Sequence, residues 1–70
     1  MLMANDFTGD QARVILEQQL SGIFPGGSIK LVGDLQSGGD DPHRVVVVRR
    51  GEEYRNFLVF PSGQVRPEVY

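Results

Sequence analysis

HRVVVVRRGEEYRNFLVF, residues 43–60, is the stretch of sequence that decides the fold. Its four consecutive valines, residues 45–48, are stiff at χ1 and favour an extended backbone. Gly51 and Glu52 suit a two-residue turn with glycine first, and residues 53–60 are again rich in apolar and aromatic side chains. The stretch therefore predicts an antiparallel hairpin in which Arg50 lies opposite Glu53 and Val46 lies opposite Phe57.

Beyond the hairpin, the chain turns once more. Pro61, Ser62 and Gly63 are typical of a tight turn, and residues 65–70 can return as a further strand. Pro67 has no N–H to give to a sheet, so we expect this last strand to lie at an edge.

A helix is predicted before the hairpin. Thr8 and Gln11 have the spacing of a capping box, while Gly22 and Pro25 suit the end of a helix. Between them, apolar residues recur at helical spacing, namely Ala12, Ile15, Leu16, Leu20 and Ile23. The pattern predicts a helix over residues 9–21, with Gly22 at its C-cap.

Residues 29–35 alternate in polarity and predict a first strand, with Gly33 marking a bulge. The polar residues 36–42 are expected to form a flexible loop, and residues 1–6 are expected to be disordered. The predicted fold class is α+β, with an N-terminal helix packed on one face of a three- to four-stranded antiparallel β-meander. Seventy residues form one small domain, residues 1–70.

A single helix can cover only one face of this sheet. One face is richer in large apolar groups, and we expect the helix to lie there; its residues are Val45, Val47, Tyr54, Leu58 and Phe60. The other face is then exposed and is predicted to bind a protein or peptide partner. That partner-binding surface consists of Arg44, Val46, Val48, Arg55, Phe57 and Val59. If the faces are the other way round, the candidate surface is the side that bears Val45, Val47 and Tyr54.

Few residues in this sequence suit metal binding or catalysis. The chain has no cysteine and one histidine. Asp40, Asp41 and His43 could approach a cation, but one imidazole without a second cluster makes an incomplete site, so no metal is predicted. The serines stand at turns and caps, where serine is expected for backbone reasons. We therefore expect no catalytic residues, no cofactor and no enzymatic activity.

Two other functions stay open beside partner binding. A homodimeric structural protein could bury the same face against its own copy. A domain that binds single-stranded nucleic acid could use the arginines Arg44, Arg50 and Arg55 with Phe57, although the net charge of −2 opposes binding to phosphates. No apolar run is long enough to span a membrane, and no signal peptide is recognised, which indicates the cytoplasm by default.

Taken in order, these segments resemble a PepSY-type domain over about residues 10–66. The matching text is residues 12–25, residues 29–35, the hairpin segment VVVRRGEEY at 46–54 and the turn segment VFPSGQV at 59–65. An aspartate common near the final turn of that family is replaced here by Phe60 or Pro61. The resemblance implies a helix followed by antiparallel strands, and a binding role that often inhibits a peptidase. It also implies an extracytoplasmic location if the chain is part of a longer PepSY-like protein.

Overall fold

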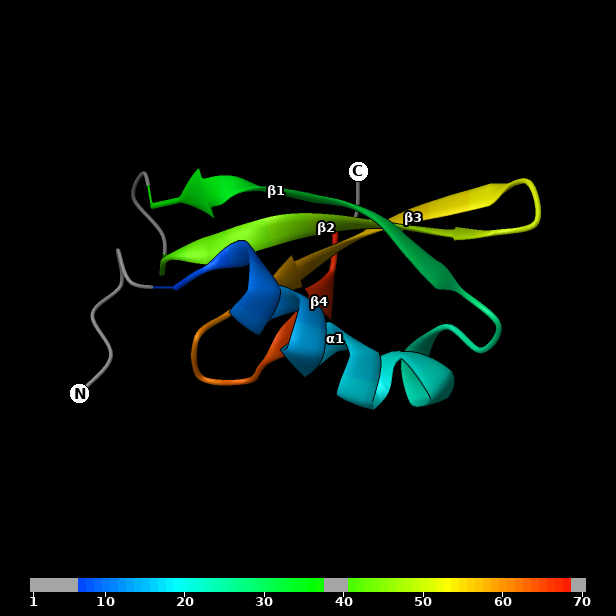
Figure 1. The fold of residues 1–70 in the computed structure, drawn as a ribbon, viewed down its shortest axis with the longest axis horizontal. Coiled ribbons are helices and arrows are strands. Elements are labelled where there is room, and N and C mark those ends of the chain that lie inside the picture. The colour runs from blue at the N-terminus through cyan, green and yellow to red at the C-terminus, as the bar shows by residue number, and fades with distance from the viewer. Residues whose placement is uncertain (1–6, 38–40, 69–70) are drawn as a thin grey trace.

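The structure, a computed structural model, describes residues 7–37 and 41–68. One helix, α1 (Gly9–Ile23), precedes four strands, β1 (Ser28–Gln36), β2 (His43–Arg50), β3 (Glu53–Val59) and β4 (Val65–Pro67). The strands form one antiparallel sheet in the order β1-β2-β3-β4, and α1 packs against one face of it (Figure 1). The predicted α+β fold is confirmed. Residues 1–6, which are predicted to be disordered, lie outside the described residues, and so do residues 38–40 of the predicted flexible loop.

The capping box forms as predicted. The backbone N–H of Gln11 donates to Oγ1 of Thr8 over 3.1 Å, and the N–H of Thr8 donates to Oε1 of Gln11 over 2.9 Å. The predicted C-cap at Gly22 is wrong, because the helix continues to Ile23 and its C-cap is Phe24. The N–H of Phe24 still reaches the carbonyl of Leu20 over 2.8 Å, and the helix ends only where Pro25 has no N–H to donate.

The central hairpin has the predicted register. Arg50 pairs with Glu53 and Val46 pairs with Phe57, and Gly51 takes a positive φ of 61° in the turn. Lys30 is the extra residue of a bulge in β1, and a second irregularity lies between Val32 and Leu35. The predicted bulge at Gly33 falls within that second irregularity and is confirmed.

β4 lies at the sheet edge, as Pro67 predicts, but it is short. It ends at Pro67 rather than continuing to residue 70, and residues 69–70 lie outside the described residues. The turn before it is closed by the N–H of Gly63, which donates to the carbonyl of Phe60 over 2.9 Å. Gly63 has a positive φ of 96°, a conformation that glycine adopts without strain.

The helix covers the opposite face of the sheet from the one predicted, and this expectation was wrong. The buried core consists of Phe7, Ala12, Leu16, Phe24, Val46, Val48, Phe57 and Val59. Phe7 and Phe24 flank the helix and enlarge the covering layer at both ends. The ring of Phe24 lies 6.2 Å from that of Phe57 in a tilted arrangement. This layer can therefore cover a face whose charged residues lie towards the strand ends.

Candidate functional site: the open face of the sheet

The predicted binding residues are mostly interior in the structure. Val46, Val48 and Val59 have no exposed surface, and Phe57 is 5% exposed. Because these side chains form the core beneath α1, they do not form an exposed binding surface. The predicted location of the partner-binding site is therefore wrong.

The two predicted site arginines have structural contacts. Arg44 is half-buried and donates from Nε to the carbonyl of Phe7 over 3.0 Å and from Nη1 to the carbonyl of Gly33 over 2.6 Å. Arg44 therefore ties the start of the helical layer to β1. Arg55 is exposed, and it pairs with Glu53 over 2.8 Å.

Arg50, Glu53 and Arg55 form a charged cluster beside the ring of Phe24. Glu53 accepts hydrogen bonds from Arg50 and Arg55, each over 2.8 Å. The hydrogen bond and positive charge of Arg50, followed by the charge of Arg55, hold the pKa of the Glu53 carboxyl below its usual value. The guanidinium of Arg50 also lies 4.2 Å from the ring centre of Phe24. The cluster thus covers the end of the core, and its charged side chains form ion pairs with one another.

The exposed surface of the sheet is the other face, which we name the open face. It carries the side chains that alternate with the core residues, namely Leu31, Val45, Val47, Tyr54 and Leu58. Leu31 is 61% exposed and Tyr54 is 57% exposed, while Val45, Val47 and Leu58 are half-buried. Among the described residues, no second layer packs on this face; α1 lies on the other side (Figure 1).

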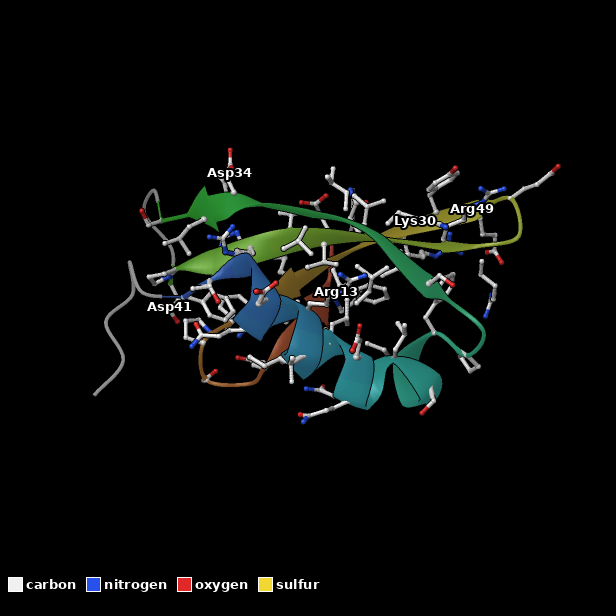
Figure 2. The ribbon with its side chains drawn as sticks, in the orientation of Figure 1. Arg13, Lys30, Asp34, Asp41 and Arg49 are labelled. Carbon is white, nitrogen blue, oxygen red and sulfur yellow. The ribbon has the colours of Figure 1, made fainter. Side chains whose placement is uncertain are left out.

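A polar hollow lies at one end of the open face, between the loop before β1 and the β2–β3 turn. Its volume is about 210 Å³, and it is lined by Gly26, Ser28, Lys30, Arg49 and Gly51. Arg49 donates from Nε to the carbonyl of Gly51 over 2.6 Å, and its guanidinium lies 5.8 Å from the ring centre of Tyr54. Figure 2 shows Lys30 and Arg49 at this same end of the sheet. We name this feature the basic hollow.

The opposite end of the open face has a second hollow of about 180 Å³. It is lined by Asp41, His43, Leu58, Phe60 and Arg66. His43 and Arg66 both lie near the ring of Phe60, with centre distances of 5.4 Å in each case. In Figure 2, Asp34 and Asp41 lie at this end of the molecule, away from Lys30 and Arg49. One end of the open face is therefore basic, while the other end carries acidic side chains together with Arg66.

The possible cation ligands near this hollow are few. Nδ1 of His43 lies 2.8 Å from the carbonyl oxygen of Asp41, a hydrogen bond rather than a shared metal ligand. Asp40 lies outside the described residues. Across residues 7–37 and 41–68, no three histidine, cysteine, aspartate or glutamate side chains cluster as metal ligands.

A third hollow, on the helix side, is the main rival to the open face. It is apolar, measures about 390 Å³ and is lined by Phe7, Asp10, Gln11, Val14, Ile15 and Pro61. Val14 is 52% exposed here, nearly as much as Leu31 on the open face. The two sites therefore offer a matched pair of exposed aliphatic residues for experiments.

No family model matches the chain, and neither the curated proteins nor the solved structures include a match. The PepSY resemblance accordingly stays a prediction. The one helix in the described part of the chain is not long and apolar enough to cross a membrane.

Proposed function

We propose that this chain is a small non-catalytic module that binds a protein or peptide partner through the open face of its sheet. The observation that carries the proposal is the pair Leu31 and Tyr54, which are more than half exposed beside three half-buried apolar residues. Apolar groups gathered on one sheet face, with polar groups around them, are typical of interaction sites. Tyrosine and arginine, here in contact as Tyr54 and Arg49, are also enriched in protein interfaces.

The test is a selection of binding peptides from a random display library, followed by affinity measurements on two matched variants. Leu31→Glu places a charge on the open face, and Val14→Glu places one at the helix-side hollow. Both side chains are more than half exposed, so both variants are expected to keep the wild-type circular dichroism spectrum.

Selected peptides should lose binding to the Leu31→Glu variant and keep it with Val14→Glu, because only the first change alters the open face. Amide shifts of the labelled protein should map the bound peptides to β1, β2 and β3. Peptides that bind the Leu31→Glu variant with unchanged affinity but no longer bind the Val14→Glu variant would place binding at the helix-side hollow instead and refute the proposal.

A homodimer through the same face is the second candidate. Lys30 and Arg49 lie at one end of the face, and Asp34 and Asp41 lie at the other end together with Arg66 (Figure 2). Two copies packed in opposite directions would bring unlike charges together. Sedimentation at tens of micromolar checks this: a dimer that Leu31→Glu separates into folded monomers would favour it over a foreign partner.

A further inference from the structure

The cations of this chain differ in how their charge is compensated. Arg13 pairs with Glu17 over 3.2 Å, and Arg50 and Arg55 share Glu53. Lys30 and Arg49 form no ion pair with any acidic side chain of the described residues. They are therefore available to pair with an acidic group from outside the chain.

The same two cations line one hollow. The basic hollow has Lys30, Arg49 and the serine Ser28 in its lining, and no acidic residue among the side chains that line it. Like charges that share a small space repel each other, and an anion placed between them relieves that repulsion. Arg49 uses Nε for the carbonyl of Gly51, which leaves its two terminal nitrogens to bind a carboxylate.

The bulge in β1 places Lys30 at this hollow. The register passes from Ile29, opposite Val48, to Leu31, opposite Val47, so Lys30 has no partner of its own in β2. Bulges commonly redirect a side chain at a sheet edge. Here the bulge sets a cation next to Leu31, the most exposed apolar group of the open face.

We propose that the occupant of the open face is an extended peptide segment with an acidic side chain seated between Lys30 and Arg49 and apolar side chains over Leu31 and Val47. This inference rests on the proposed function and adds the chemistry of the partner. His43 and Arg49 lie six residue steps apart on β2, about 20 Å at the usual rise per residue. An extended segment of about seven residues therefore reaches from the basic hollow to the hollow beside Phe60.

A peptide fits this surface better than a nucleic acid or a second copy does. The chain has a net charge of −2, which opposes the multiple phosphate contacts of nucleic-acid binding. The apolar side chains of the open face expose an area on the order of a few hundred Å². A stable protein–protein interface usually needs about 800 Å² from each partner.

The experiment selects random seven-residue peptides on the wild-type chain and sequences the binders. Aspartate or glutamate should be enriched next to leucine, valine or aromatic residues. Binding of these peptides should weaken about twofold to thirtyfold in the Lys30→Gln/Arg49→Gln double variant, since each exposed ion pair contributes modestly. Replacing the peptide's acid by its amide should weaken wild-type binding similarly and have little effect on the double variant.

Arg13→Gln is the matched control, because Arg13 is an exposed cation on α1 and lies away from the basic hollow. It should leave peptide affinity unchanged. Some peptides could map to the open face without acidic enrichment, or bind the double variant as tightly as the wild type. Either result would overturn this inference and leave the proposed function standing.

Failure of both proposals gives a different result. Peptides that bind only at the helix-side hollow, or no binders at all from the library, would overturn both. Single-stranded oligonucleotides that shift the open-face amides at micromolar concentration, or a dimer that Leu31→Glu separates, would replace the peptide with another occupant.

Discussion

Phe57 and Tyr54 lie three residues apart on β3 and point to opposite faces, so truncating each one tests which face α1 covers. Phe57 is 5% exposed and packs against Phe24, whereas Tyr54 is 57% exposed. A buried aromatic side chain removes about 200 Å² from water. Phe57→Ala should therefore cost about 3–5 kcal/mol of unfolding free energy, including the cavity that it leaves.

That loss is comparable with the whole stability of such a small domain, roughly 3–5 kcal/mol. Phe57→Ala should consequently be largely unfolded at 25 °C. Tyr54 buries less than half of its surface, so Tyr54→Ala should cost at most about 2 kcal/mol and keep the fold.

Urea denaturation followed by far-ultraviolet circular dichroism measures both changes. The wild-type chain and the two variants should be compared at the same protein concentration, because self-association would add apparent stability. A folded Phe57→Ala variant beside an unfolded Tyr54→Ala variant would refute the assignment of the two faces.

Three further predictions concern single contacts. Replacing Arg44 by methionine should lower the free energy of unfolding by about 1–3 kcal/mol, because the carbonyls of Phe7 and Gly33 lose their donor; an unchanged urea midpoint would contradict the tie to β1. Gly27→Ala should destabilise the fold by about 1–3 kcal/mol, since a Cβ there would lie 2.6 Å from the ring of Phe24. Gly22→Ala has nothing within 4 Å of the added Cβ and should stabilise α1 by up to about 1 kcal/mol. Thermal melts that reverse this order would refute the close packing of Gly27 against Phe24. In a carboxyl NMR titration, the pKa of Glu53 should lie below its usual value, and it should rise in the Arg50→Gln variant. Because the folded-state pKa is depressed, the ionised Glu53 carboxyl stabilises the fold above the unfolded-state pKa, and this contribution is lost as the pH falls through the folded-state pKa.

The order of elements and the hairpin register could be predicted because they depend on local signals. The valine run, the turn at Gly51 and the capping box of Thr8 act over a few residues, and each forms as expected. The bulge at Gly33 could also be predicted, because a glycine inside a strand often marks a bulge or a close backbone approach. In the structure, a Cβ at Gly33 would lie 3.0 Å from the carbonyl oxygen of Val45.

The face that the helix covers could not be predicted from strand composition alone. Both faces of the hairpin carry four or five apolar side chains, and the charged residues beside Val46 and Phe57 suggested exposure to water. In the structure, Arg44 and Arg50 lie at the strand ends and reach backbone carbonyls, so they do not prevent burial of the centre. The useful signal was Phe7 and Phe24, the two aromatic residues that flank the helix, because they need a large apolar surface to pack against.

The most direct test of the central claim is the exposure of individual methyl groups to a soluble paramagnetic gadolinium chelate, measured by NMR at low protein concentration. The methyls of Leu31 should relax strongly, and those of Val45, Val47 and Leu58 should relax to an intermediate degree. The methyls of Val46, Val48 and Val59 should be protected, because these residues have no exposed surface. Strong relaxation of Val46 and Val48 with protection of Leu31 and Val47 would contradict the central claim, because the free face of the sheet would then be the one assigned here to the core.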